Sequence, residues 1–186
     1  MIAMVRRHAT ARNVIAVLAA IGVLALVSHG LVLPAYRAVA SGFDPFGLQL
    51  PLTRAMVAIQ RGAFGPGIEQ ASICFVAIHV FSQTLVAGFY VLFWAWMMSK
   101  SPRPLARGAL LLLPLLAVLC VLVEDAGFLV LVFSDSHVPR HDVTTATLIV
   151  HRVRFFLGDV NLAITLTLAA FTIYFRSRAP AVGNVE

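Results

Sequence analysis

Four long runs of apolar residues constrain this chain more than any other feature of its sequence. A helix that crosses a membrane needs about 20 consecutive, mostly apolar residues, and in lipid it satisfies its own backbone hydrogen bonds. With 60% apolar and only 12% charged residues, the composition departs strongly from that of a typical soluble domain. We therefore predict an all-α fold, an integral membrane four-helix bundle in a single domain over residues 1–186, with spans at 14–34, 71–98, 108–133 and 155–175.

The distribution of Lys and Arg predicts how this bundle is oriented. Cytoplasmic flanks of membrane helices are enriched in both residues. With the N-terminus inside, the inner side carries eight of the 14 basic residues, and the inner loop 100–107, "KSPRPLAR", contains no acid. We therefore expect both termini in the cytoplasm and a multi-pass protein of the cell membrane, of the bacterial inner-membrane type. The first run is longer than the apolar core of a signal peptide, about 7–15 residues, so we expect it to be retained.

The charge and the motifs narrow the choice of partners and cofactors. The formal net charge of +6 comes from residues at the ends of apolar runs, which indicates the lipid bilayer as partner and no nucleic acid. Cys74 and Cys120 lie in different apolar runs and form no CxxC pair. The sequence contains no Walker motif, nucleophile elbow or HExxH. It therefore predicts no cofactor and no metal, and it leaves open whether the protein is an enzyme.

The first outer loop, residues 35–68, is too long for a tight turn and is patterned like two short helices. "YRAVASGF" can form one helix that ends at Gly42, and "DPFG" is typical of a turn. "LPLTRAMVAIQRG" can form a second helix, because its apolar residues follow helical spacing and Gly62 closes it. We expect a short helical hairpin at the outer surface, and this is where a protein partner could bind.

Part of this loop resembles a known family. In residues 33–54, a proline follows a membrane helix, then come an aromatic residue, "FG", two residues, "LP" and a threonine. This segment resembles one in the inner-membrane F proteins of type II secretion and type IV pilus systems. The resemblance covers about a ninth of the chain, and the large cytoplasmic domains of that family are missing. It implies a similar loop shape and an assembly function. The matching residues are Pro34, Tyr36, Phe46, Gly47, Leu50, Pro51 and Thr53.

Two adjacent acids, Glu124 and Asp125, interrupt the third apolar run. A charge at the centre of a bilayer costs about 2.5–3.5 kcal/mol even on the mildest scale. In an antiparallel pair of helices, residues equally far from the connection lie at the same height. We therefore expect Arg152 or Arg154 on the fourth helix to neutralise Glu124 or Asp125.

Further polar residues are expected in the same outer half of the bundle: Asp159, His79, Gln83, His29 and His151. The cluster is either a structural ion-pair network, a ligand or catalytic site with Glu124, Asp125 and His79 as candidates, or a contact for lipid headgroups. Haem ligation by two of the histidines is disfavoured, because their depths match only roughly. In "DSHVPRHD", His137 and His141 could bind a metal, but a solvated loop is the preferred interpretation.

Three functions fit these features. The preferred one is a non-enzymatic assembly, accessory or partner-binding subunit that uses residues 35–68. The alternative is a small membrane enzyme that acts on a lipid-like substrate through the polar residues in the outer half. A transporter module is the third, and it would require a homo-oligomer, a state that the sequence leaves open.

Overall fold

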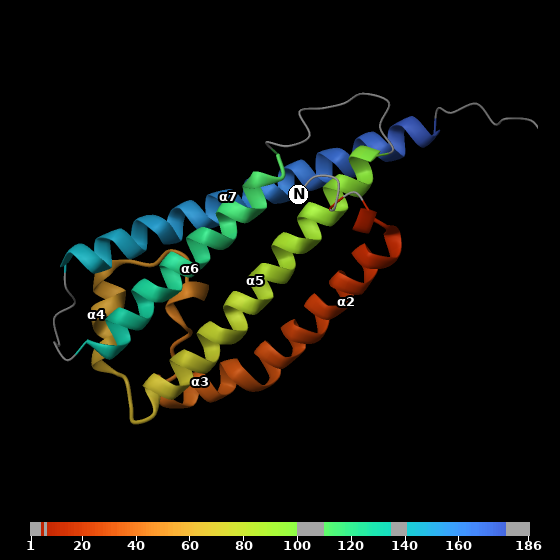
Figure 1. The fold of residues 1–186 in the computed structure, drawn as a ribbon. Helices are drawn as coiled ribbons and strands as arrows, with labels where there is room; N and C mark the ends of the chain where they lie inside the picture. Colours follow the sequence, from red (N-terminus) through yellow and green to blue (C-terminus); the bar gives the residue numbers. More distant parts are fainter. Residues whose placement is uncertain (1–4, 6, 100–109, 135–140, 178–186) are drawn as a thin grey trace, which may run out of the picture.

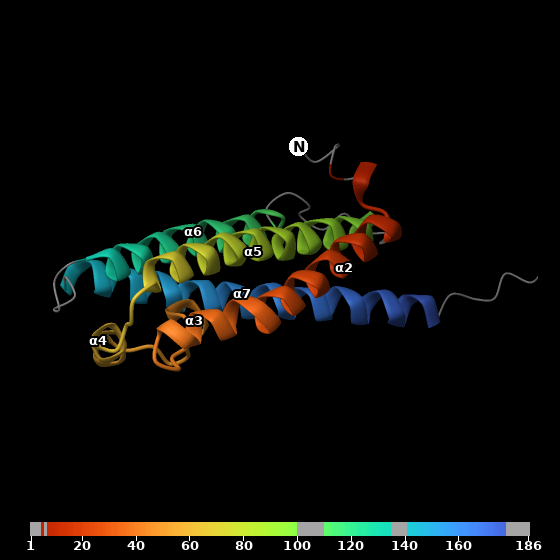
Figure 2. The same cartoon turned by 90° about the horizontal axis from the view of Figure 1, so that it is seen from below.

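The computed structural model describes residue 5 and residues 7–99, 110–134 and 141–177, and within these ranges the chain is all α-helical apart from its turns and loops. Long helices run alternately up and down, and each packs against its neighbour in sequence (Figures 1 and 2). The start of the first long helix and the end of the last helix lie at one end of the bundle (Figure 1). We call the other end, which carries residues 40–67, the loop end. The helices are α2 with its continuation to Val39, α5, α6 and α7.

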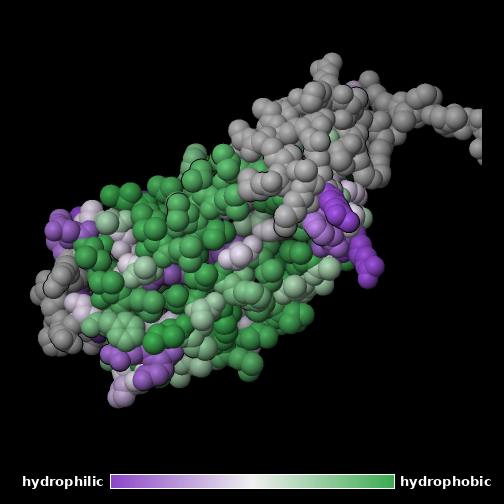
Figure 3. Space-filling model, viewed as in Figure 1, coloured by the Kyte–Doolittle hydropathy of each residue, from purple (hydrophilic) through white to green (hydrophobic). Residues whose placement is uncertain are grey.

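Four helices are long and apolar enough to cross a membrane: Ala11–Val39, Ile68–Met98, Leu112–Phe133 and His141–Tyr174. On the face seen in Figure 3, apolar side chains predominate in the middle of the molecule, and polar ones gather toward its two ends. Many of these apolar side chains are exposed, as expected for a surface that faces lipid rather than water. The four apolar runs of the sequence thus correspond to four candidate membrane spans.

The first long helix is built from three segments. Helix α2 (Ala11–Val27) begins at Thr10, whose hydroxyl accepts a hydrogen bond from the Asn13 N–H. A π-helical turn, η1 (Ser28–Val32), joins it to α3 (Leu33–Val39). A wide π turn accommodates Pro34, which has no N–H to donate to the preceding turn. The chain therefore continues as one helix past residue 34, where we had predicted the span to end.

The connection from α3 to α5 folds back against the bundle. Ser41 and Gly42 adopt positive φ angles of 53° and 86°, which turn the chain after α3. A short 3-10 helix, η2 (Phe46–Leu48), follows, and the Leu50–Pro51 peptide bond is cis. Helix α4 (Arg54–Gly62) then begins at Thr53, whose hydroxyl caps the Met56 N–H. One face of α4 is buried through Val57 and Gln60.

The remaining helices differ in extent from the predicted spans. Helix α5 covers Ile68–Ser99, and α6 covers Leu112–Phe133, while the predicted start at 108 lies outside the described residues. Pro114 falls in the first turn of α6, where an N–H has no partner within the helix, so proline is tolerated there. Helix α7 (His141–Ser177) begins well before residue 155, because the polar stretch that precedes the apolar run continues the helix.

Buried apolar side chains form three clusters. Two lie at the loop end: one joins α3 to α5 around Tyr36 and Phe75, and the other seats Phe46 and Val57 against α6 and α7. The third surrounds Trp94 near the opposite end. Helices α6 and α7 approach closely at Gly127, where a Cβ would lie 2.2 Å from the Thr147 hydroxyl oxygen. The polar side chains described next lie between these clusters.

Candidate functional site

Three helices bring charged and polar side chains to one level inside the bundle. Glu124 and Asp125 come from α6, His151 and Arg154 from α7, and His79 from α5. At 1.5 Å per residue, Glu124, His79 and His151 lie about 14–17 Å from the loop-end termini of their helices. We call these five residues the buried charge cluster. All five are buried, and Glu124 and Asp125 are 0% and 2% exposed.

Glu124 has a partner for each of its carboxylate oxygens. The Nε atom of Arg154 lies 2.6 Å from Oε2, an ion pair that is not a linear hydrogen bond. Nδ1 of His151 lies 2.7 Å from Oε1. The guanidinium of Arg154 also lies over the ring of Phe155, 4.2 Å from its centroid. A buried carboxylate is tolerated only with such partners.

Asp125 is paired with a histidine rather than with an arginine. Nδ1 of His79 lies 2.9 Å from one of its oxygens and 3.2 Å from the other. The opposite ring nitrogen of His79 lies 3.4 Å from Nη1 of Arg154, which connects the two halves of the cluster. The His79 ring stacks on Phe75, with centroids 5.3 Å apart. The cluster is therefore one continuous network across α5, α6 and α7.

The connection between α3 and α4 covers this network with its backbone. Nη2 of Arg154 donates a hydrogen bond of 2.6 Å to the Gly47 carbonyl, and Nε2 of His151 lies 2.9 Å from the Gln49 carbonyl. A Cβ atom on Gly47 would lie 3.5 Å from Oε1 of Glu124 and 3.7 Å from Oδ1 of Asp125. The backbone at position 47 therefore lies directly against both acids, and even a methyl group there would be in van der Waals contact with them.

The hydrogen-bond geometry assigns the charges. His151 faces a carboxylate and a carbonyl, and both of these accept, so both of its ring nitrogens donate when Glu124 is ionised. The ring is then an imidazolium. His79 faces an acceptor, Asp125, and a donor, Arg154, which fits a neutral ring. Two carboxylates are thus balanced by Arg154 and His151, so the cluster carries no net charge, as a dry interior requires.

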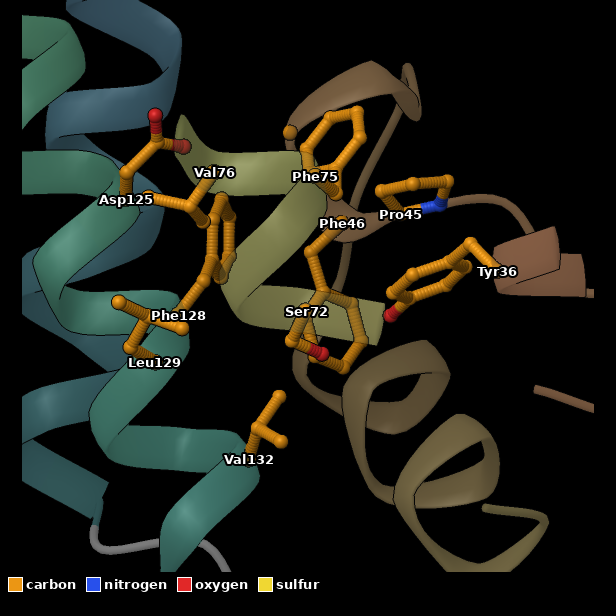
Figure 4. Close-up of a pocket in the computed structure, with 11 residues that line it drawn as sticks. Tyr36, Pro45, Phe46, Ser72, Phe75, Val76, Asp125, Phe128, Leu129 and Val132 are labelled. Carbon is orange, nitrogen blue, oxygen red and sulfur yellow. The ribbon is translucent and has the colours of Figure 1, made fainter. Parts of the chain in front are cut away.

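A cavity of about 20 Å³ lies beside Asp125. Figure 4 shows aromatic rings around it, among them Phe46 from η2, Phe128 from α6 and Tyr36 from α3. Phe46 and Phe128 have ring centroids 5.2 Å apart. This volume accommodates about one water molecule and no larger ligand.

Side-chain amides fix the rest of the connection. Gln49 and Gln60 both donate to the Asp44 carbonyl, at 2.5 Å and 2.6 Å, and Gln49 also donates to the Gln60 side chain at 2.7 Å. Arg61 of α4 donates to the Ser134 carbonyl at the end of α6 at 2.6 Å. Its partial burial lowers the pKa of the Arg61 guanidinium by desolvation. The segment is therefore held at several points in addition to the buried charge cluster.

The structure brings together five of the nine predicted polar residues and places the other four elsewhere. Arg152 is exposed, because two residues of α7 rotate it about 200° from Arg154. Asp159 shares the exposed face of Arg152, and His29 is exposed on the first helix, where its ring bonds the Ala25 carbonyl. Gln83 lines a separate cavity together with Arg154. The neutralising arginine is therefore Arg154, and Arg152 has no part in it.

Metal binding has no support in the described part of the chain. No three His, Cys, Asp or Glu side chains come together there in an arrangement that could hold a metal ion. His141 contacts Arg54 instead. His137, the other histidine considered for a surface metal site, lies outside the described residues.

Sequence reasoning missed the two backbone carbonyls of the connection. Glycine and proline in "DPFGLQLP" indicated a turn, and Phe46 and Leu52 are apolar enough to be buried. Nothing in that pattern shows that the turn lies against acids 77 positions later in the chain, from Gly47 to Glu124. No family model, curated protein or solved structure matches this chain.

Proposed function

We propose that this chain is a multi-pass protein of the cell membrane without catalytic activity, an assembly or partner-binding subunit. Its loop end faces away from the cytoplasm, and the α4 surface there binds a partner protein. The buried charge cluster is the clamp that holds this surface in place. The observation that carries the proposal is that every group of the cluster is used to bind another group of the chain.

The geometry around the acids argues against catalysis by Glu124 or Asp125. Both oxygens of Glu124 are occupied, and Gly47 covers the acids. The space beside Asp125 admits one water. A general acid or base must reach a substrate within about 3.2 Å, and neither carboxylate is open to one.

The carbonyls of the connection supply a reason for charges inside the bundle. Non-helical backbone at membrane depth is tolerated only where protein groups satisfy it, because lipid offers no hydrogen-bond donors. Arg154 and His151 supply such donors to Gly47 and Gln49. Glu124 and Asp125 then balance the positive charge that this requires. The acids are the counter-ions of the clamp.

The clamped segment presents an apolar surface at the end of the bundle. Ile59 is 64% exposed and Met56 37% exposed on α4, whereas Val57 is buried. Leu50, before the helix, is also exposed. Exposed apolar side chains beside the polar loop end are typical of a protein–protein contact. The resemblance of residues 33–54 to the secretion and pilus F proteins supports an assembly role for this surface.

Site-specific photo-crosslinking in cells tests this function. A photoreactive amino acid is placed at Ile59, and a matched one at Leu26, which is exposed on α2. We expect one discrete protein adduct from position 59 and none from position 26. The adduct should disappear in an Arg154→Gln background in which the chain still accumulates in the membrane. The absence of any protein adduct at position 59, or an adduct unaffected by Arg154→Gln, contradicts the proposal.

A further inference from the structure

Asp159 of α7 is an ionisable residue that the buried charge cluster does not use. Its side chain is exposed, and no residue in the described part of the chain forms an ion pair with it. Five residues separate it from buried Arg154, which rotates it by about 140° around the helix. Asp159 therefore faces the surroundings of the bundle rather than its interior.

The level of Asp159 is close to the middle of the bundle. Nη1 of Arg154 lies 3.4 Å from Nε2 of His79, so these two residues mark one level on α7 and α5. Both helices run in the same direction from the loop end (Figure 1), and five residues farther along, Asp159 is level with Thr84 of α5. Residues 83 and 84 are the midpoint of α5. In a bundle that spans the bilayer, Asp159 thus lies near the centre of the hydrocarbon layer.

An exposed carboxylate at this level is unfavourable in lipid. Ionisable side chains within membrane spans almost always face protein or a water-filled space, where they have a partner. Arg152 lies on the same exposed face about 10 Å closer to the loop end, and its long side chain can extend toward the headgroups. The short side chain of Asp159 cannot. The carboxylate therefore indicates a cation that comes from outside this chain.

The residues around Asp159 have the spacing of a helix–helix contact. Exposed residues, which we call the α7 stripe, recur along α7 at alternating steps of three and four: Phe156, Asp159, Ala163, Leu166, Ala170 and Ile173. With this spacing one helix packs along another at a small crossing angle. The two alanines leave room beside the larger residues, and small side chains let membrane helices approach closely.

The charge of Asp159 restricts what can cover the α7 stripe. A second copy in the same orientation would pair the two stripes in parallel and bring two Asp159 carboxylates together, where like charges repel. A lipid acyl chain fits an apolar surface but offers no cation at this depth. A membrane-spanning helix with a basic side chain provides both the apolar contact and the positive charge.

We infer that the α7 stripe binds one membrane-spanning helix of a partner protein, and that a Lys or Arg in the middle of this helix pairs with Asp159. The inference rests on the proposed partner-binding role and names the chemistry of the partner inside the membrane. The start of α4 lies on the same side of the molecule, because Thr53 and Arg54 line a cavity of about 220 Å³ together with Arg152. One partner can therefore contact both surfaces.

Synthetic transmembrane peptides test the role of the charge. Leucine–alanine peptides with identical flanks carry Lys, Leu or Glu at the centre and a dansyl group, and each is reconstituted with the purified chain in phosphatidylcholine vesicles. Energy transfer from the two tryptophans of the chain to the dansyl group measures binding. We expect the Lys peptide to bind at least about fivefold more tightly than the Leu peptide. This preference should disappear in Asp159→Asn and pass to the Glu peptide in Asp159→Lys.

Two adjacent positions on α7 locate the contact. Ala163 belongs to the α7 stripe, while Leu162 lies beside the stripe and is 50% exposed. Ala163→Phe places a large side chain in the contact, so binding of the Lys peptide should weaken at least about fivefold. Leu162→Phe is the matched control and should leave the affinity unchanged.

Four results overturn the inference. Equal binding of the Lys and Leu peptides shows that Asp159 recruits no cation. A Lys preference that persists in Asp159→Asn belongs to another acid. Equal effects of Ala163→Phe and Leu162→Phe place the helix elsewhere. Energy transfer between two labelled copies of the chain that is lost in Asp159→Asn assigns the stripe to a second copy.

The two surfaces can fail separately. Photo-crosslinking at Ile59 reports on α4 alone, so a missing adduct there together with a Lys preference at Asp159 refutes the α4 contact and leaves the α7 stripe. If Asp159→Lys does not fold, the comparisons with Asp159→Asn and Ala163→Phe still decide the question.

Discussion

At the scale of single residues, each group of the buried charge cluster is held by its own set of partners. Arg154 pairs with Glu124 and also donates to the Gly47 carbonyl. His151 bridges Glu124 and the Gln49 carbonyl. Asp125 has His79 as its partner. The two acids are adjacent in sequence, but their partners differ in charge, so their removal should differ in cost.

We expect Glu124→Gln to destabilise the protein more than Asp125→Asn. Removing one partner of a buried ion pair costs about 3–5 kcal/mol, and Glu124→Gln leaves Arg154 and His151 uncompensated. Asp125→Asn removes the partner of a neutral ring, at a cost of about 1–3 kcal/mol. Asp159→Asn, on the exposed face of α7, is the control, with an expected change within about 0.5 kcal/mol. Unfolding of the detergent-solubilised protein, followed by circular dichroism, measures all three. A larger loss for Asp125→Asn contradicts the charge assignment.

The sequence predicted part of this site. Glu124 and Arg154 are equally far from the connection between their helices, which predicted that they lie at the same height. The two side chains form an ion pair. The same argument could not choose between Arg152 and Arg154, because depth says nothing about rotation around the helix. His29 was expected in the cluster from its depth alone, and it is exposed. The carbonyls of Gly47 and Gln49 carry no side-chain signal and could not be foreseen.

At the scale of helices, the apolar composition predicted which segments form long helices better than it predicted where those helices begin and end. Apolar runs identify helices of spanning length, since only such helices bury them in lipid. Helix α7 already includes the polar stretch from His141, where the hydroxyls of Thr145 and Thr147 donate to carbonyls four residues earlier in the same helix. Pro34 suggested an end, and a π turn carries the helix past it. Hydropathy does not reveal such side-chain hydrogen bonds or a π turn.

The contact of α6 with α7 depends on the absence of a side chain at position 127. A Cβ there would lie 2.2 Å from Oγ1 of Thr147 and 2.9 Å from its methyl carbon. We expect Gly127→Ala to separate the helices and to cost about 1–3 kcal/mol by overpacking. Thr147→Ala removes both clashing atoms, so it should recover part of the loss in the double variant. A thermal unfolding series of the two single variants and the double variant measures the coupling. Additive effects contradict the contact.

At the scale of the whole molecule, the bundle has two dissimilar ends. The loop end carries α4 and the chain that covers the buried charge cluster, and the other end carries the start of α2 and the end of α7 (Figure 1). On the face seen in Figure 3, apolar side chains predominate between the ends. The basic flanks of the sequence predict that the loop end faces away from the cytoplasm.

Labelling of intact cells with a membrane-impermeant maleimide tests this orientation. Cysteines are introduced singly at Ala58 on α4 and at Ala11 at the start of α2, after Cys74 and Cys120 are replaced by alanine. We expect position 58 to be labelled in intact cells and position 11 only after lysis. The reverse pattern means that the bundle is inserted the other way round.

The clamp itself is tested most directly by comparing two adjacent positions on α4. Val57 is 0% exposed and its neighbour Ala58 is exposed, so in solubilised protein a cysteine at 57 should react slowly with maleimide and one at 58 rapidly. If Arg154 holds the connection against the bundle, Arg154→Gln should raise the rate at position 57 to near that at 58, while Arg152→Gln leaves it slow. The fluorescence of Trp94 serves to show that the far end of the bundle stays folded. A slow rate at position 57 in folded Arg154→Gln protein would contradict the clamp.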